Sequence, residues 1–160
     1  MSPEDSPRFI VDLNCGKLAK WLRMIGYNTK LFDHRDDKYL VHLAQKENRI
    51  ILTRDTQIMQ RRIIAIGELK ALFVTSDDPL CQIRQVVKEL GLKSSFKPFS
   101  LCLECNQLLE KISKENVKDR VPPYVFRHQA QYVECPNCHR VFWQGTHWQA
   151  MVKKLEGLAQ

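Results

Sequence analysis

Arg8-Phe-Ile-Val-Asp12 is followed directly by Leu13-Asn-Cys-Gly-Lys-Leu-Ala-Lys-Trp-Leu-Arg-Met-Ile-Gly26, and these two segments indicate the fold class. The first is an apolar run that ends in an aspartate, which predicts a buried strand. In the second, apolar residues recur with helical spacing from Leu18 to Ile25, and Gly26 is a residue type that often ends helices. A short strand that leads into an amphipathic helix opens a β-α-β unit, so the segments predict an α/β fold.

The same alternation continues along the chain. Further apolar runs of strand length lie at 29–32, 50–53 and 71–75. Helical spacing is found after Asp36 and Asp37, and again from Pro79, which suits the first turn of a helix, to Gly91. We therefore expect one α/β domain over residues 8–92, with a parallel sheet and flanking helices.

Charge and hydropathy limit the class of protein. The formal net charge is +7, and residues 1–99 carry 17 Lys and Arg against 12 Asp and Glu, so most of the basic excess lies in this part of the chain. A basic balance favours an anionic partner such as nucleic acid. No apolar run approaches the ~18 residues of a membrane-spanning helix, and the first residues are polar. We expect a cytoplasmic protein.

Four aspartates fall at or just after the carboxyl end of a predicted strand, namely Asp12, Asp33, Asp55 and Asp77. These strand ends share one edge of an open parallel sheet, where ligands bind, so the carboxylates are expected to converge. Clustered carboxylates repel one another, and Mg²⁺ or Mn²⁺ commonly neutralises them. Such a cation can acidify a water molecule and orient a phosphate, so the pattern suggests metal-dependent phosphodiester hydrolysis.

Helix capping is the alternative role for these aspartates. Asp78 precedes a proline and suits an N-cap, and Asp36 or Asp37 could cap the following helix. Asp55 could cap the segment that follows it, and Asp33 could belong to a solvated loop.

Basic residues flank the acidic positions. Lys17, Lys20 and Arg23 follow one another at intervals of three, which predicts that they share a helix face opposite the apolar one. Arg54, Arg61 and Arg62 lie close to Asp55 in sequence. These residues either form ordinary solvated faces or contact a phosphate backbone.

Two C-x-x-C hooks, Cys102-Leu-Glu-Cys105 and Cys135-Pro-Asn-Cys138, predict a zinc site with four thiolate ligands. Four cysteines close the coordination sphere, so the zinc is expected to be structural. Disulfides or free thiols are the alternative, and nothing in the sequence indicates a secretory protein. Cys15 and Cys81 are interpreted as buried thiols without chemistry.

The hooks belong to a second expected module, residues 100–158, after a linker at 93–100. Apolar residues between the hooks suggest a short helix or strand, and Pro122 and Pro123 suggest an extended path. A final helix at 148–155 is expected to pack on the zinc module. Aromatic and basic residues either form the core of this module or bind single-stranded nucleic acid; they are Tyr124, Phe126, Arg127, His128, Phe142, Trp143, His147 and Trp148.

Five motifs follow one another along nearly the whole chain: residues 9–27, Arg49-Ile-Ile-Leu-Thr-Arg-Asp55, the two hooks, Arg120-Val-Pro-Pro-Tyr124 and Gly145-Thr-His-Trp148. Together they resemble the Mut-seven C-terminal RNase domain family. The resemblance implies a PIN-like nuclease domain joined to a zinc ribbon, with metal-dependent ribonuclease activity and RNA as partner.

By position, the resemblance implies catalytic, Mg²⁺- or Mn²⁺-binding roles for Asp12, Asp37 and Asp55. Asp77 is the fourth catalytic candidate, with the adjacent Asp78 as its alternative. Lys17, Arg23 and Arg54 match as phosphate contacts, and Lys20 and Arg61 join them as expected RNA-binding residues. Two other functions stay open: a noncatalytic RNA-binding adaptor, and a protein-interaction module that docks through the zinc ribbon.

Overall fold

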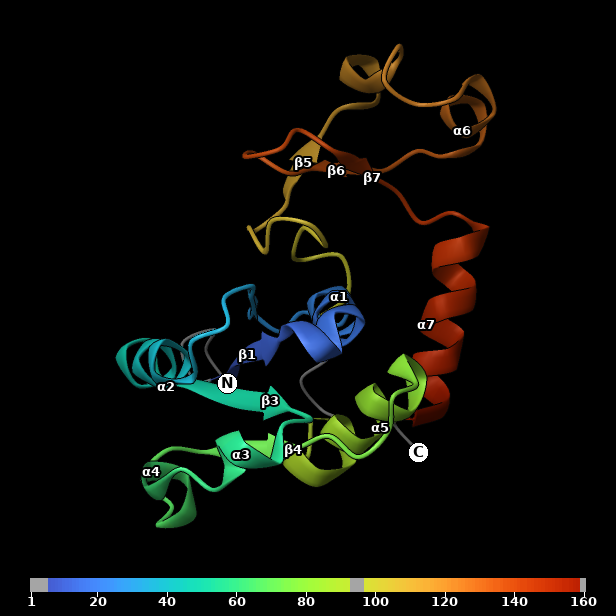
Figure 1. The fold of residues 1–160 in the computed structure, drawn as a ribbon. Helices are drawn as coiled ribbons and strands as arrows, with labels where there is room; N and C mark the ends of the chain where they lie inside the picture. The colour runs from blue at the N-terminus through green and yellow to red at the C-terminus, as the bar shows by residue number, and fades with distance from the viewer. Residues whose placement is uncertain (1–5, 93–96, 159–160) are drawn as a thin grey trace.

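The computed structural model describes residues 6–92 and 97–158, and the side chains of His147 and Leu158 lie outside that description, as does part of the expected linker. Four parallel strands form the larger sheet, in the order β2-β1-β3-β4 (Figure 1). These are β1 Arg8–Asp12, β2 Thr29–Phe32, β3 Arg49–Thr53 and β4 Ala71–Phe73. The flanking helices are α1 Gly16–Met24, α2 Asp37–Lys46, α3 Thr56–Met59, α4 Arg62–Ala65 and α5 Pro79–Leu90. The predicted α/β class is confirmed.

Two apolar layers hold the helices on opposite faces of this sheet. Successive side chains of a strand point to opposite faces, so Phe9 and Val11 pack under α1 and α5. Ile10 and Ile51 point the other way and pack with residues of α2, α3 and α4. All four side chains are fully buried, so the sheet lies at the centre of the core.

Aspartates cap three helices of this domain. Asp36 accepts a hydrogen bond from the Lys38 amide at 3.0 Å, Asp55 from Gln57 at 2.9 Å and Asp78 from Cys81 at 3.1 Å. Each carboxylate satisfies an amide that has no partner within the helix. The predicted cap at Asp78 is confirmed, and Asp36 rather than Asp37 caps α2.

The cysteine-containing segment forms a small antiparallel sheet in the order β5-β6-β7, with β5 Glu110–Ile112, β6 Tyr132–Glu134 and β7 Val141–Phe142. A 3-10 turn, Lys114–Val117, and helix α6, Pro123–His128, lie between β5 and β6. The expected extended path is right for Pro122 but wrong for Pro123. Pro123 begins α6, because the first position of a helix needs no amide hydrogen bond.

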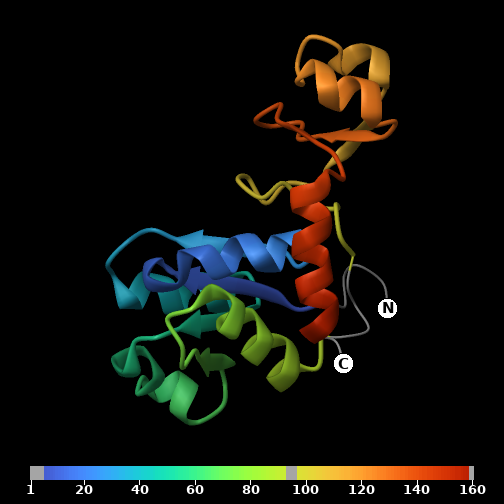
Figure 2. The same ribbon diagram turned by 90° about the vertical axis from the view of Figure 1, so that its right-hand side faces the viewer.

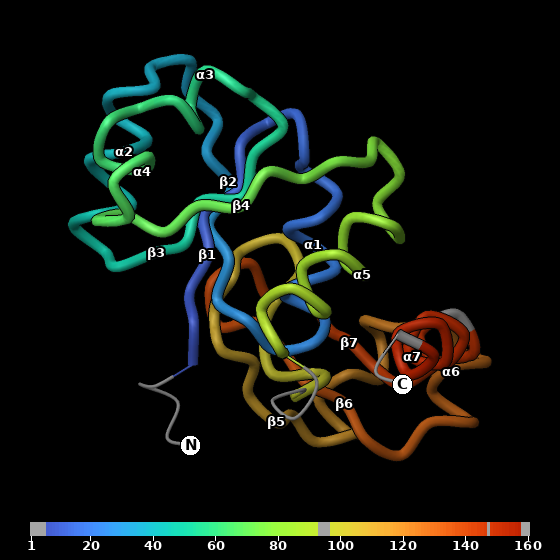
Figure 3. Tube along the Cα trace, turned by 90° about the horizontal axis from the view of Figure 1, so that it is seen from below, coloured from blue at the N-terminus to red at the C-terminus, as the bar shows by residue number. Residues whose placement is uncertain are grey.

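Helix α7, Thr146–Leu158, lies beside α5 in both ribbon views and in the view from below (Figures 1, 2 and 3). Leu155 is buried in the same apolar cluster as α1 and α5, and Trp148, Met151 and Val152 pack against that cluster. The prediction that this helix packs on the zinc module is therefore wrong for Met151, Val152 and Leu155, whereas Trp148 also lies beside Leu103 and Phe142 of the cysteine-containing segment. Residues of 112–126 already cover the small core of that module, so the apolar face of α7 is buried on the larger domain.

The aromatic residues of the second segment divide into two groups. Phe126 and Trp143 pack on the small core around Tyr132, and Trp148 packs on the large one. Tyr124 is 66% exposed and its ring lies 4.3 Å from that of His128. Core packing is thus confirmed for the first group, while the surface interpretation stays possible for Tyr124 and His128. Within the described ranges no helix has the length and apolarity to cross a membrane.

Candidate active site and zinc centre

The first candidate site lies where the strand order of the parallel sheet reverses. The chain passes from β1 to β2 through α1 on one face, then from β2 to β3 through α2 on the opposite face. Strand β3 leads to β4 through α3 and α4, which pack on the same face as α2, so the neighbouring strands β1 and β3 send their connections to opposite faces. In open α/β sheets, ligands bind outside the carboxyl ends of such strands. Asp12 ends β1 and Asp55 follows β3 by two residues.

A threonine hydroxyl connects these two aspartates. Thr53 Oγ1 donates to Asp12 Oδ2 at 2.5 Å and accepts from the Asp55 amide at 3.0 Å. Asp12 Oδ1 also accepts from the Asn14 amide at 2.8 Å. Asp12 is only 8% exposed, and a buried carboxylate is tolerated when hydrogen bonds satisfy it. The strand ends thus hold Asp12 and Asp55 beside the same side chain.

The other predicted carboxylates lie apart from this pair. Asp37 is the first residue of α2, and its Oδ2 lies 4.0 Å from Arg61 Nη2. Asp77 is exposed in the loop before α5, next to the capping Asp78. Among the described residues no hydrogen bond connects Asp37 or Asp77 to Asp12 or Asp55.

Carboxylate and hydroxyl oxygens are hard ligands of the kind that Mg²⁺ and Mn²⁺ prefer, so the donor atoms of this edge suit such a cation. Mg²⁺ commonly uses one or two carboxylates and completes its sphere with water and substrate phosphate. In the part of the chain that the structure describes, however, the aspartates do not form a group of three or more clustered ligands. Asp12 and Asp55 are therefore the two candidate carboxylates at the ends of β1 and β3.

Arg54 and Cys15 line the same strand ends. Arg54 Nε is buried and has no hydrogen-bond partner among the described residues. Burial and the neighbouring Asp12 carboxylate raise the pKa of the Cys15 thiol to about 11, despite the opposing charge of Arg54. Cys15 is consequently a neutral thiol at pH 7, as expected for a residue without chemistry. Cys81 is exposed, so its predicted burial is wrong.

The expected RNA-binding residues have different surroundings. Lys17 is exposed on α1, and Lys20 Nζ lies 2.9 Å from Glu104 Oε1 in the first hook. Arg23 is only 8% exposed, and its guanidinium donates to the carbonyl oxygens of residues 29 and 103 at 2.9 and 2.7 Å. The expected exposed position of Arg23 is therefore wrong: this side chain is part of the fold, and we leave it out of the RNA surface.

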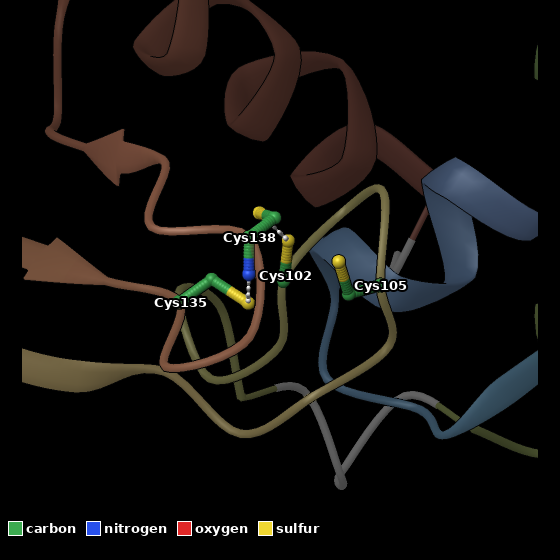
Figure 4. Close-up of side chains that lie close together, drawn as sticks. All are labelled: Cys102, Cys105, Cys135 and Cys138. Carbon is green, nitrogen blue, oxygen red and sulfur yellow. Dashed lines mark hydrogen bonds between the residues drawn. The ribbon is translucent and has the colours of Figure 1, made fainter.

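The second candidate site is the cysteine cluster. The sulfur atoms of Cys102, Cys105, Cys135 and Cys138 all lie within 4.8 Å of one another (Figure 4). Cys102 Sγ and Cys138 Sγ are 3.7 Å apart, and all six cysteines of the chain are free. A tetrahedron with Zn–S bonds of ~2.3 Å has sulfurs about 3.8 Å apart, so this spacing suits zinc and excludes the disulfide alternative.

Both hooks have the same backbone turn. The amide of Cys102 donates to the carbonyl of Gln107 at 2.8 Å, and the amide of Asn106 donates to the carbonyl of Cys102 at 2.9 Å. In the second hook the equivalent bonds join Cys135 with residues 140 and 139, at 3.0 and 2.9 Å. Asn106 and His139, the residues after each second cysteine, have positive φ values of 63° and 64°. This turn aims two sulfurs from each hook at one point.

Deprotonation of these sulfurs is linked to metal binding. Burial raises the pKa of the Cys102 thiol to about 12, although the amides of Glu104 and Cys105 point to its sulfur and favour the thiolate. At neutral pH this buried sulfur therefore keeps its proton unless a cation displaces it. The four cysteines are thus able to hold a metal ion, with Zn²⁺ the ion that four thiolates in this arrangement prefer.

The first hook is fastened to the turn between α1 and β2. Asn106 accepts from the Thr29 amide at 2.9 Å and donates to Asn28 Oδ1 at 2.8 Å. Just before this turn, Gly26 has φ +102°, and a Cβ there would lie 2.5 Å from the Lys97 carbonyl oxygen. Only glycine allows the Lys97 backbone this close, with its amide donating to Ile25 at 2.7 Å.

Two of these residues were missed in the sequence. Thr53 could have been found from strand periodicity, because Val11 pairs with Leu52, so Asp12 and Thr53 follow on the same face of adjacent strands. Asn106 could have been suspected from its place after the second cysteine, since asparagine adopts positive φ more readily than most residues. Its contacts with residues 28 and 29 leave no signal in the sequence.

Comparison with known proteins gives one finding. The model of the Mut7-C RNAse domain family matches residues 7–155, nearly the whole chain. No curated protein and no solved structure shows significant similarity to the chain.

Proposed function

Because the chain belongs to the Mut7-C RNAse domain family, whose description indicates a ribonuclease-like function, we propose that it hydrolyses RNA phosphodiester bonds with a divalent cation. The cation would be Mg²⁺ or Mn²⁺, held by Asp12 and Asp55. Asp37 and Asp77 would complete the acidic edge when substrate is bound. Zinc at the four cysteines would have a structural role only, because its coordination sphere is closed.

The observation that carries the proposal is that the Thr53 hydroxyl contacts both the Asp12 carboxylate and the backbone amide of Asp55, which places the two residues side by side at the strand ends. The two carboxylates come from adjacent strands at the position where α/β sheets bind ligands. Thr53 donates a hydrogen bond to Asp12 Oδ2 and the Asn14 amide donates one to Oδ1, which together orient the carboxylate and leave its remaining lone pairs for a ligand. Capping accounts for one oxygen of each carboxylate, since Asp12 also caps the 3-10 turn Leu13–Cys15 through Oδ1, but it does not account for the bond from Thr53 to Asp12 Oδ2.

Positively charged groups near this pair suit a phosphate. The buried, unpartnered Nε of Arg54 needs an acceptor, and a phosphate oxygen would supply one. Arg61, whose guanidinium is near Asp37, could hold the next phosphate along the strand. When bound, the cation would acidify the attacking water and neutralise charge that develops on the phosphate. The protein groups would hold the scissile phosphate in line for attack.

The direct test is incubation of the purified protein with RNA and DNA of one sequence, with Mn²⁺, with Mg²⁺ and with EDTA. We expect cleavage of RNA that requires Mn²⁺ or Mg²⁺ and that returns when Mn²⁺, but not Zn²⁺, is added back after chelation. No cleavage under any condition contradicts the ribonuclease proposal. Cleavage that persists in EDTA contradicts the proposed cation.

A second candidate function is a noncatalytic RNA-binding adaptor. The absence of a cluster of three or more carboxylate ligands among the described residues favours it. Tight RNA binding without cleavage under all cation conditions would support this function, and failure to bind any polynucleotide at moderate salt would instead favour a protein-interaction module.

A further inference from the structure

A groove of about 890 Å³ follows the free side of β2, the edge strand of the parallel sheet. Helix α1 forms one wall and the first cysteine hook forms another. We name this the edge groove; among its lining residues are Gly16, Lys20, Lys30, Lys97, Glu104 and Leu108. It does not include the acidic pair, and it touches the zinc centre only at Cys105 of the first hook, so neither proposed role accounts for it.

Positive charge dominates the edge groove. Six Lys and Arg residues line it against two acidic residues, Asp33 and Glu104. Two of the six, Arg23 and Arg49, are buried and donate to backbone carbonyls, so they set the shape of the wall. The lysine ammonium groups remain for a ligand. An anionic partner therefore fits this groove electrostatically.

The lysines keep donors available even where they have partners. Lys20 is paired with Glu104 and Lys30 with Glu47, at 2.9 and 2.8 Å, yet their side chains are 56% and 41% exposed. An ammonium group has three donors, so one ion pair leaves two of them free to bind phosphate. Lys97 is exposed on the groove beside the end of α1, where its amide donates to Ile25.

One end of the groove reaches the acidic edge. Asp12 pairs in register with Phe32, the last residue of β2, and the next residue, Asp33, lines the groove. Gly16, four residues after Asp12, also lines it and presents no side chain to block the path. Strand β2 has four residues, which at ~3.3 Å per residue gives a path of about 13 Å beside the site, enough for a few nucleotides.

The walls favour a single strand over a duplex. Leu31 and Leu108 are exposed large apolar side chains on this groove, and unpaired bases offer apolar faces that could contact them. A peptide added to the β2 edge is less suitable, because Asn106 already takes the first amide of that strand.

We propose that the edge groove binds the phosphate backbone of single-stranded RNA and leads it to Asp12 and Asp55. Lys30 and Lys97 contact successive phosphates, and Lys20 joins them at the wall of α1. This inference rests on the proposed function for the identity of the strand. Binding itself needs no cleavage and can be measured separately.

The test compares two double variants of the full-length, zinc-loaded protein. Lys30→Gln/Lys97→Gln removes two charges from the groove, and Lys46→Gln/Lys88→Gln removes two exposed lysines from the last turns of α2 and α5, away from it. Binding of fluorescein-labelled oligouridine is measured at several NaCl concentrations without added Mg²⁺ or Mn²⁺. Zinc content and melting temperature establish that each variant is folded.

We expect the groove variant to bind more weakly and to lower the slope of log K against log salt by about 1.4, since each phosphate contact with a single strand contributes about 0.7. The control variant should keep the wild-type slope. Equal slopes for both variants, or no binding by the wild type, overturn the groove. If the wild type binds duplex RNA as tightly as oligouridine, and the groove variant loses the same affinity for both, the proposed preference for a single strand is overturned. If the groove variant lowers the slope but the wild type cleaves RNA with none of the cations, the groove proposal holds and only the ribonuclease proposal is contradicted.

Discussion

The zinc centre and the acidic edge differ in how much of a metal site the chain completes by itself. Four cysteine sulfurs lie within 4.8 Å of one another, whereas at the acidic edge the Thr53 hydroxyl links the Asp12 carboxylate to the backbone amide of Asp55. A closed set of four thiolates stabilises a fold, and an open set of oxygens leaves room for water and substrate. The difference is the one expected between a structural and a catalytic centre.

The origin of the ligands explains this difference. Each hook positions two sulfurs with one local turn, so only two segments have to meet. The carboxylates come from separate strands, and the sheet alone brings them to one edge. Loss of a cysteine should therefore affect the fold first, and loss of an aspartate should affect chemistry first.

Loss of a zinc ligand should have the largest effect. We expect one zinc per chain in the wild type, and loss of that zinc with a large fall in melting temperature for Cys102→Ser or Cys135→Ser. Structural zinc contributes on the order of 10 kcal/mol in small zinc-finger peptides, and here it joins two hooks. Elemental analysis and thermal unfolding measure both effects. Cys81→Ser, outside the cluster, is the control. Zinc-free wild-type protein, purified without chelators, contradicts the site.

Replacement of either acidic residue should remove activity but not the fold. Asp12→Asn and Asp55→Asn keep the shape of the side chain and lose its charge, which costs several kcal/mol of transition-state stabilisation, or about 10³-fold in rate. The matched control is Asp36→Asn, which caps α2 as Asp55 caps α3. Asparagine is about as good an N-cap as aspartate, so Asp55→Asn and the control should keep the wild-type melting temperature.

The double variant sharpens this test. Because both carboxylates are expected to act on one cation, Asp12→Asn/Asp55→Asn should be little slower than either single variant. Near-normal rates in both single variants, together with lower melting temperatures, would mean that these carboxylates only cap or support the fold. Equal loss of activity in the Asp36 control would have the same meaning.

The sequence correctly predicted those features that depend on residues close together in the chain. The bounds of β1 and β2, the caps at Asp78 and Gly91, and the four cysteines all follow from residues close together in the chain. The packing of α7 did not, since its apolar spacing shows that one face is buried but not which core buries it. The catalytic roles of the aspartates are still predictions, because one residue type serves both capping and metal binding.

Arg23 shows a further limit of sequence patterns. Its interval from Lys17 and Lys20 placed it on a basic face, yet it lies deep enough to reach the Leu103 carbonyl, 80 residues away. Helical spacing fixes the direction of a side chain but not what a distant segment brings to it. The docking of the first hook converts an apparently exposed arginine into a buried one.

Replacement of Arg23 should therefore lower stability without changing the electrostatics of RNA binding. Arg23→Gln leaves the carbonyls of residues 29 and 103 unpaired, at a cost of about 2–4 kcal/mol. Lys17→Gln, on the exposed side of the same helix, should keep the melting temperature but lower the salt slope of RNA binding by about 0.7. Thermal unfolding and salt titration give both quantities. A lower slope in a fully stable Arg23→Gln protein would return Arg23 to the RNA surface.

The smallest expected effect concerns Glu47. Unlike the carboxylates of the acidic edge, it is already paired with two positively charged side chains. Glu47 accepts from Lys30 Nζ and Arg49 Nε, both at 2.8 Å, and the hydrogen bond from Lys30, with help from Arg49, lowers its pKa below the ordinary 4.5. A lowered folded-state pKa means that the ionised form stabilises the fold above pH 4.5. That contribution is lost as the pH falls through the lowered value.

Glu47→Gln should consequently melt below the wild type at pH 7, by up to about 1 kcal/mol or about 2–4 °C. The difference should shrink as the pH falls below 4.5, because the wild-type carboxylate then takes up its proton and loses its advantage over the amide. Thermal unfolding from pH 7 down to pH 3 measures this, with the exposed Glu68→Gln as control. A difference that stays constant over this range would mean that Glu47 stabilises the sheet by its shape and hydrogen bonds, whatever its charge.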